Sequence, residues 1–469
     1  MIEAGQYDMR TGAGLIACPR CDALHVEAEL TEGETARCVR CGHVLARPRE
    51  GAFTQIVALS FTSLVLMVAA VFFPFLEVSR MGIGNATSLF GVAMAFSEGW
   101  LMPLTVAVLA FIVGLPALRA VLLVYVLLPM RGQGRPARHA GEAFRLSELL
   151  RPWSMAEIFV IGTSVALVKV AGLATVSLGP AFWAFCALII VGAASDVFTC
   201  AATIWDTLED RGAFTDGREV VPDPETAAHD RQIVEGTPPC PGPRRMSASD
   251  GLSDHAPVLT AHRAGLVGCR GCGRVWPETM DVCGRCGAPL VPPDRRSLQA
   301  VWAWWLAGLI FYIPANLWPM LRTQSFLGLA GNTEATILGG VIDLMHYGNY
   351  GIAAIVFVAS IVVPIGKFVV IAWLARVAGK PASVEAAHTR LRALEAVEFI
   401  GRWSMIDVFV VAILSALVQL GFVASIHPGP AAVSFALSVA FTMLSALSFD
   451  PRLIWRGLPL RTRRDRTAE

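Results

Sequence analysis

The chain has 469 residues and a formal net charge of +1, and 55% of its residues are hydrophobic whereas only 16% are charged. Soluble domains carry roughly 25% charged residues, so much of this surface must face something other than water, as the mean hydropathy of +0.57 also indicates. The near-neutral charge argues against nucleic acid as a partner, because nucleic-acid binding depends on a basic surface. The first 50 residues do not have the pattern of a cleaved secretory signal.

The first element along the chain, residues 1–50, contains two CxxC pairs, and a second such set occupies residues 265–296. Two CxxC pairs present four thiolates around one point, which is the ligand set of a structural zinc site. We therefore expect two small zinc ribbons, each binding one Zn²⁺. The expected ligands are Cys18, Cys21, Cys38, Cys41, Cys269, Cys272, Cys283 and Cys286.

Two other interpretations of the CxxC pairs stay open. A rubredoxin-like iron site uses the same four thiolates, and a redox protein uses a CxxC pair as a reactive dithiol. With four protein ligands a zinc ion has no open position, so catalysis by the metal is not expected. Arginines beside the cysteines are expected to offset the excess negative charge of the thiolates: Arg20, Arg37, Arg40, Arg270, Arg274 and Arg285.

Long apolar segments follow each cysteine element, within residues 51–206 and 297–456. A helix of about 20 apolar residues spans a bilayer, so the first uncharged run of each half crosses once. The next run of each half contains one internal base, Arg119 or Lys367, and predicts a second long helix. The last run, 158–195 or 408–449, is long enough for two helices with a tight Gly-Pro turn between them. The sequence thus predicts four membrane helices in each half.

The two halves are a repeat. Residues 153–205 match residues 403–455 at a constant offset of 250, without a gap. The predicted fold is therefore an all-α polytopic membrane protein with two tandem four-helix transmembrane modules, each preceded by a small four-cysteine zinc ribbon. Residues 207–264 are rich in Pro, Gly and charge and are expected to be a flexible linker. Residues 457–469 are expected to be a basic tail.

The distribution of basic residues predicts the orientation in the membrane, because short cytoplasmic loops are rich in Lys and Arg. The loop after the second helix of each module carries five bases and the C-terminal residues 452–466 carry six, whereas the opposite loops carry almost none. We therefore expect both termini, both ribbons and the linker on the cytoplasmic side.

Charged residues inside membrane segments are costly and mark functional positions. Each module has a base in its second helix and an acid at the start of its third, which predicts a base–acid pair or a shared polar pocket: Arg119 with Glu157 and Lys367 with Asp407. Alternatively the acids belong to capping boxes, since Ser154 and Ser404 stand three residues before them. Lys169 has no charged counterpart in the second half and is a copy-specific position.

These features together resemble the paraquat-inducible protein A family of bacterial inner-membrane proteins. The resemblance rests on the two ribbons, the four helices after each, and the Trp-Ser-Met motif that opens each third helix, followed by Glu157 or Asp407. The segment 448–452 also fits, but residues 199–202 of the first half depart from it, so Asp450 and Arg452 are specific to the second copy.

The resemblance implies a function that composition and spacing do not establish. Family members act beside periplasmic MCE-domain proteins that move lipid between the inner and outer membranes, and they support envelope integrity. The implied role is therefore to load or unload phospholipid at the inner membrane. A scaffold or regulator whose ribbons dock a cytoplasmic partner, and a thiol redox protein, stay open as alternatives. The chain has no Walker A, GxSxG, HExxH or Rossmann motif, so enzymatic activity is not expected.

Overall fold

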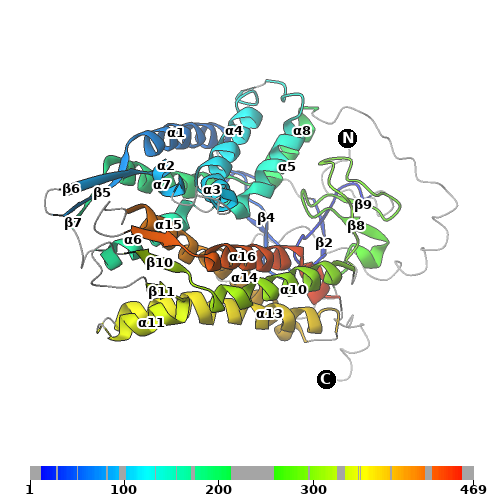
Figure 1. Cartoon of the computed structure of the whole chain (residues 1–469). Coiled ribbons are helices and arrows are strands. Elements are labelled where there is room, and N and C mark those ends of the chain that lie inside the picture. The colour runs from blue at the N-terminus through cyan, green and yellow to red at the C-terminus, as the bar shows by residue number, and fades with distance from the viewer. Residues whose placement is uncertain are drawn as a thin grey trace.

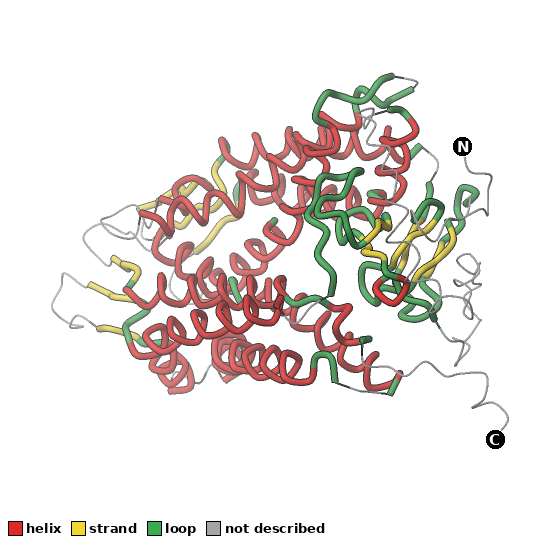
Figure 2. Tube along the Cα trace, turned by 90° about the vertical axis from the view of Figure 1, so that its right-hand side faces the viewer, coloured by secondary structure: helices red, strands yellow, loops and turns green. Residues whose placement is uncertain are grey.

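Figure 1 shows the computed structural model of the chain, whose helices lie between two ends that contain β-strands. The ribbon strands β2, β8 and β9 lie toward one end, and the strands β5–β7, β10 and β11 lie at the other. Figure 2 shows the same separation from the side. The structure describes residues 12–27, 30–49, 51–80, 83–94, 102–132, 134–154, 156–170, 175–212, 258–293, 296–324, 333–346, 348, 350–380, 383–417 and 425–456.

The first module begins with the long helix α1 and ends with the short amphipathic helix α8, which follows the last membrane helix. In chain order its elements are α1 (Ala52–Phe72), β5 (Pro74–Arg80), β6 (Ile83–Ser88), α2 (Leu89–Met94), α3 (Met102–Leu109), a π-helical turn η2 (Ala110–Gly114), α4 (Leu115–Leu127), α5 (Ala140–Leu150), a 3-10 turn η3 (Arg151–Trp153), α6 (Ala156–Val170), β7 (Thr175–Leu178), α7 (Pro180–Phe198) and α8 (Ala201–Asp210).

The second module repeats this order. Its elements are α10 (Arg296–Leu317), β10 (Leu321–Gln324), β11 (Thr333–Ala335), α11 (Ile337–His346), α12 (Tyr350–Phe357), a π-helical turn η6 (Val358–Val362), α13 (Val363–Val377), α14 (Val384–Trp403), α15 (Ile406–Leu417), β12 (Ser425–Pro428), α16 (Pro430–Ser448) and a 3-10 turn η7 (Pro451–Ile454).

Six helical segments in the described part of the chain are long and apolar enough to cross a membrane, three in each module. They are 52–72, 102–127, 180–198, 296–317, 353–377 and 430–448. The predicted third helix of each module is also helical, but α6 and α15 have only 15 and 12 residues. The predicted fold class is confirmed: the chain is a mostly helical, multi-pass membrane protein with a four-cysteine cluster before each module.

The sequence analysis did not predict the sheets at the end opposite the ribbons. Strands pair in the order β6-β5-β7 in the first module and β11-β10-β12 in the second. Both pairings in each sheet are antiparallel, and the central strand follows the first membrane helix directly. After each third helix the described chain resumes as a strand, β7 or β12, which joins this sheet before the fourth helix begins.

The Gly-Pro pairs were expected to form tight turns between two helices. In the structure each pair instead joins a strand to a helix. Pro180 and Pro430 occupy the first position of α7 and α16, where a missing N–H costs nothing. The glycine before each proline lies against the end of the first helix. A Cβ at Gly429 would stand 2.0 Å from the Pro319 carbonyl oxygen, so this close approach excludes every side chain.

A π-helical turn interrupts the second membrane helix of each module, just before the repeated prolines Pro116 and Pro364. Proline cannot donate a hydrogen bond to the carbonyl four residues earlier, and its ring displaces that carbonyl. The wider turn accommodates both effects, so these prolines change the local helix type.

The third helices α6 and α15 pack against each other and join the modules. At their crossing the rings of Phe159 and Phe409 lie edge to face, with centroids 5.8 Å apart. A Cβ on Gly162 would lie 3.3 Å from the Cβ of Phe409. Glycine therefore allows the close contact of the two helices, as small residues commonly do in membrane bundles.

The two ribbons form one unit. The first contains the hairpins β1–β2 (Leu15–Ala17, Leu24–Val26) and β3–β4 (Ala36–Arg37, Val44–Ala46). The second contains the hairpin β8–β9 (Leu266–Gly268, Val275–Pro277), preceded by the 3-10 turn η5 (His262–Ala264). The Ala17 N–H donates to the Gly273 carbonyl across the contact, and a small apolar core that includes Leu15, Leu24 and Val275 lies between the ribbons.

Ordered structure extends into both ends of the expected linker 207–264. Helix α8 continues to Asp210 because Leu208 is buried against the first module. At the other end, the Leu24 N–H donates to the Leu259 carbonyl, and the Ala261 N–H donates to the Asp22 carbonyl. The remaining linker residues, including Cys240, and the tail 457–469 lie outside the described residues.

Candidate metal centres and the cavity between the modules

The first cysteine cluster has the geometry of a tetrahedral thiolate site. The Sγ atoms of Cys18 and Cys41 are 3.5 Å apart, and those of Cys21 and Cys38 are 3.4 Å apart. All four lie within 4.8 Å of one another. Zinc–sulfur bonds of about 2.3 Å in a tetrahedron place the sulfurs roughly 3.8 Å apart, so this donor set fits a zinc ion.

The second cluster has the same arrangement. Cys269 and Cys286 have Sγ atoms 3.4 Å apart, and those of Cys272 and Cys283 are 3.6 Å apart. The indole N–H of Trp276 donates to the Cys283 sulfur at 3.2 Å, a contact that stabilises a thiolate. Both clusters can bind a metal ion, and all their thiols are free and at least half-buried.

Each CxxC turn is followed by a residue in the left-handed backbone region. Three of these are glycines, Gly42, Gly273 and Gly287, with φ between 66° and 76°. The fourth is Asp22, with φ 62°, which is the one non-glycine residue with positive φ in the described chain. Aspartate tolerates this region less well than glycine, so its presence here calls for a contact that glycine cannot make.

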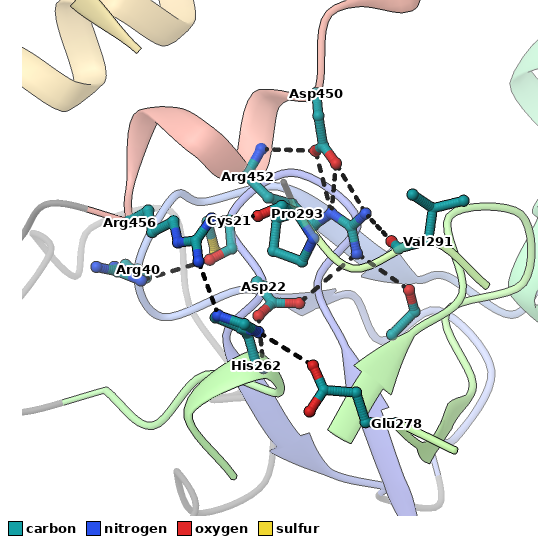
Figure 3. Close-up of polar contacts among 11 residues, drawn as sticks. Cys21, Asp22, Arg40, His262, Glu278, Val291, Pro293, Asp450, Arg452 and Arg456 are labelled. Carbon is teal, nitrogen blue, oxygen red and sulfur yellow. Dashed lines mark hydrogen bonds and ion pairs between the residues drawn. The ribbon is translucent and has the colours of Figure 1, made fainter. Parts of the chain in front are cut away.

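Asp22 joins the first ribbon to the second. Its Oδ2 accepts a hydrogen bond from the His262 N–H at 2.9 Å, and its Oδ1 lies 3.9 Å from the Arg452 guanidinium. Burial raises the pKa of this carboxyl to about 6, although the His262 N–H and Arg452 both act to lower it. Figure 3 shows Asp22 between His262 and Arg452.

Asp450 and Arg452 form the centre of this buried network. The Arg452 Nε donates to Asp450 Oδ1 at 3.0 Å and its Nη2 donates to Oδ2 at 2.8 Å, a bidentate pair. The remaining N–H groups donate to the carbonyls of Gly268 and Val291 in the second ribbon segment. Figure 3 shows these contacts, which connect the end of the second module to both ribbons.

The first ribbon packs mainly on the second module, although its β4 segment also contacts α8 of the module that it precedes in sequence. Cys18, Cys21 and Cys38 share an apolar core with residues of α13 and α14. Arg20 forms an ion pair with Glu395 at 2.7 Å. The Arg40 guanidinium lies over the Trp455 ring, 5.0 Å from its centroid.

The second ribbon packs on the first module. Its four cysteines share a core with residues of α1, α4, α5 and α8. Arg285 is paired with Asp206 and Glu209, and Arg145 donates to the Gly287 carbonyl at 2.6 Å. Burial raises the pKa of the Asp206 carboxyl, partly offset by the Arg285 charge. Each ribbon thus contacts the module of the other repeat.

This crossing also explains several ribbon arginines. From the sequence, these arginines were expected to offset the negative charge of the thiolates. In the structure Arg20, Arg40 and Arg285 hold the ribbons on the modules, and Arg274 pairs with Glu27 of the first ribbon at 2.9 Å.

The internal base of the first module has a different partner from the expected one. Arg119 pairs with Asp196 on α7, with Nη2 2.5 Å from Oδ1. Arg151 approaches the same carboxylate, with its Nε 4.0 Å from Oδ2. Glu157, the expected partner, is exposed at the start of α6 and lines the same cavity as Arg119. Asp196 was missed because the sequence analysis used it only as the boundary of an uncharged run.

The corresponding base of the second module faces a hydroxyl. Lys367 is buried and its Nζ lies 3.4 Å from Thr442 Oγ1 on α16. At the repeat offset of 250, Ala446 stands where Asp196 stands in the first module, so the second copy lacks that carboxylate. The side chains of Asp407 and Lys169 lie outside the described residues, although both positions are helical.

The capping-box interpretation has limited support. Helix α6 begins at Ala156, two residues after Ser154. The Ser404 hydroxyl is buried and has no hydrogen-bond partner among the described residues, so it does not cap α15.

A cavity of about 780 Å³ lies between the two modules and contains these groups. It is lined by Arg119, Glu157 and Asp196 from the first module and by Lys367 and Thr442 from the second. Arg20 of the first ribbon and Glu395 of α14 complete the wall on the ribbon side. The remaining lining is largely apolar, so the cavity has both polar and apolar surfaces.

The fold and these sites define a class: a multi-pass membrane protein with two repeated helical modules and two four-cysteine clusters that can bind metal ions. The chain belongs to the family described as Paraquat-inducible protein A, whose model matches residues 53–209 and 298–458, one stretch in each module. The resemblance inferred from the sequence is therefore confirmed.

Known relatives align over nearly the whole chain. It is 33% identical over 445 residues to the Intermembrane transport protein PqiA of Escherichia coli K12, covering 95% of this chain and 96% of the relative. It is 28% identical to a Probable intermembrane transport protein of Haemophilus influenzae, covering 94% of this chain and 96% of the relative. The Lipophilic envelope-spanning tunnel protein A of Escherichia coli K12 is also 28% identical, covering 93% of this chain and 90% of the relative. No solved structure matches the chain.

Proposed function

We propose that this protein is a non-enzymatic component of lipid transport across the bacterial envelope. It resides in the inner membrane and loads or unloads phospholipid there, in contact with a periplasmic MCE-domain protein. The names of its relatives, which include intermembrane transport and an envelope-spanning tunnel, support this role.

The orientation rests on the base-rich loops. The base-rich segments after the second helices include Arg131 and Arg376 and lead into α5 and α14, and the ribbons pack on these two helices. Lys and Arg accumulate in short cytoplasmic loops, so the ribbons are cytoplasmic. The two three-stranded sheets then face the periplasm and are the surface available to the MCE-domain partner.

The observation that carries the proposal is the cavity between the modules. Its 780 Å³ fall within the range of about 300–1,000 Å³ that is usual for sites that bind small molecules. It joins charged groups to apolar side chains within membrane-spanning helices, which is the chemistry needed for an amphipathic ligand.

Filling this cavity tests the function. Gly192 lines the cavity on α7, and a Cβ there would meet nothing within 4 Å. Gly192→Phe should therefore fold but block the cavity, and it should abolish delivery of labelled phospholipid from proteoliposomes to a soluble MCE-domain acceptor. Gly340→Phe on α11 is the matched control, because its Cβ also enters open space and it does not line the cavity. Equal delivery by the two variants would contradict the proposal.

The scaffold alternative has one observation in its favour, the peripheral position of the ribbons. However, the ribbon faces that carry Arg20, Arg40 and Arg285 are used within the chain. The redox alternative requires a reactive thiolate, and reactive cysteines are partially exposed. Seven of the eight cluster cysteines are buried, which favours the structural role.

A further inference from the structure

Three polar side chains at the inner part of the cavity have hydrogen-bonding capacity that the described protein does not use. The Ser60 hydroxyl and the Arg119 Nε are buried without a partner. Lys367 is 4% exposed, and its ammonium group, which has three donors, has one long contact to Thr442 at 3.4 Å. Buried donors without acceptors are unfavourable, so an acceptor with several oxygens would stabilise this group.

The ammonium group of Lys367 has no acidic partner among the described residues. Arg119 is paired with Asp196, and Arg151 lies near both Asp196 and Glu148, whereas the printed contact of Lys367 is with the Thr442 hydroxyl. The cavity lining contains as many acids as bases: Glu157, Asp196, Glu395 and Glu398 with Arg20, Arg119, Arg151 and Lys367. The case for an anionic ligand therefore rests on Lys367, because a buried ammonium group without a carboxylate inside a membrane-spanning region favours an anion.

The walls beside these donors are apolar. They are formed by Leu64, Met67, Leu188, Ile189, Met443 and Leu447. Free phosphate would leave this surface in contact with water, whereas a molecule with both an anionic group and hydrocarbon chains would cover it. Phosphate oxygens also match the geometry of arginine and lysine donors.

We propose that Ser60, Arg119 and Lys367 bind the phosphate group of a phospholipid, with its hydrocarbon chains against the apolar wall. This assignment rests on the proposed transport function and names the headgroup subsite within it. The subsite lies in the ribbon-side half of the membrane modules, because Asp196, which pairs with Arg119, is two residues before the end of α7 at Phe198.

A photocrosslinking experiment tests the subsite. A benzophenone amino acid replaces Leu64, which lines the cavity, or Val65, which is 53% exposed on the outer face of the same helix. The protein is reconstituted in nanodiscs that contain ³²P-labelled phosphatidylethanolamine and phosphatidylglycerol. Both positions should acquire label in the otherwise unchanged protein.

Lys367→Met and, separately, Ser60→Ala should reduce labelling at position 64 by at least about fivefold, since each removes a hydrogen bond to a charged group. Labelling at position 65 should not change. Arg376→Met is the matched control, because Arg376 is on the same helix as Lys367 but stacks on Trp302 and does not line the cavity. Ser60→Ala removes one oxygen atom only, so it retains the test if Lys367→Met fails to fold.

Unchanged labelling at position 64 in both variants would overturn the subsite, while the delivery assay with Gly192→Phe would still report on transport. A second arm uses ³²P-labelled inorganic phosphate in equilibrium dialysis. Retention of this probe in a Lys367-dependent manner, without lipid labelling at position 64, would overturn the lipid assignment and identify free phosphate as the ligand.

Discussion

Arg20 of the first ribbon lies 2.7 Å from Glu395 on α14, so the ribbon that opens the chain is anchored on the second membrane module. Both side chains are partly exposed, 28% and 48%, and such ion pairs contribute little by themselves. The contact matters mainly as a marker of the larger apolar interface around Cys18, Cys21 and Cys38. With the second ribbon on the first module, the two ribbons together connect the two modules.

The crossing predicts which module responds to loss of each metal site. Cys38→Ser should increase amide hydrogen exchange mainly in α13 and α14, and Cys283→Ser mainly in α5 and α8. The reason is that metal binding provides most of the folding energy of so small an element, and its unfolding uncovers the module beneath it. Each variant is the control for the other. Exchange that rises in the module next to the substituted ribbon in sequence would contradict the crossed arrangement.

Metal content is predicted separately. We expect two zinc ions and no iron per chain in protein purified without chelators, measured by plasma mass spectrometry. Cys38→Ser and Cys283→Ser should each retain one zinc ion, because each cluster supplies all four of its ligands. A single zinc ion in the unsubstituted protein, or iron in either site, would contradict this prediction.

Asp22 allows a test of the buried network. Asp22→Gly suits the left-handed backbone at this position but removes the acceptor of the His262 N–H and the carboxylate near Arg452. We expect a net loss of about 1–2 kcal/mol in stability without loss of zinc. Asp22→Asn keeps an acceptor oxygen and should lose less. A more stable glycine variant in thermal unfolding would show that the residue serves the turn only.

The glycines before α7 and α16 give a steric prediction. Gly429→Ala places a Cβ 2.0 Å from the Pro319 carbonyl oxygen, and the backbone must shift to relieve the contact. Overpacking of this kind costs typically 1–3 kcal/mol, which should appear as a lower melting temperature in detergent. Gly366→Ala on α13 is the control, because its Cβ would meet nothing within 4 Å. Equal melting temperatures for the two variants would contradict the predicted clash.

The sequence was sufficient for features that have a periodic or repeated signature. Apolar runs predicted the helices at α1, α4, α7 and their counterparts, and CxxC spacing predicted both clusters. The third strand of each sheet was missed because β5 and β7 are separated by most of the module, so their pairing has no local pattern. The hairpin β5–β6 is local, but it follows the apolar run of the first helix directly and was read as a loop. The crossed ribbons could not be predicted for the same reason: which module a ribbon contacts depends on long-range packing.

The site residues show the same limit. Arg119 and Lys367 were identified because a charge in an apolar run is conspicuous, but their partners depend on which helices are neighbours. Chain order suggested the third helix, whereas α4 contacts α1 and brings Arg119 to Asp196 on α7. Asp450 and Arg452 were identified only as a departure of one repeat from the other, and their contacts with both ribbons required the structure.

The last prediction concerns the Arg119–Asp196 pair. Asp196→Ala leaves the Arg119 guanidinium, which is 12% exposed, without its carboxylate partner. The variant should destabilise the first module by about 2 kcal/mol. This value is below that of a fully buried pair because Asp196 is one-third exposed and solvent screens the interaction. The double variant with Arg119→Met should be less destabilised than Asp196→Ala alone, since no uncompensated charge remains. A double-mutant cycle from thermal unfolding measures this coupling.

Glu157→Ala provides the matched control for that cycle. Glu157 lines the same cavity as Arg119 but is exposed at the start of α6, so its removal should cost little and should add independently to Arg119→Met. Strong coupling between Arg119 and Glu157, with additive effects for Arg119 and Asp196, would reverse the assignment and favour the pairing first expected from chain order. The two cycles use the same base and differ only in the acid, so their comparison identifies the partner of Arg119.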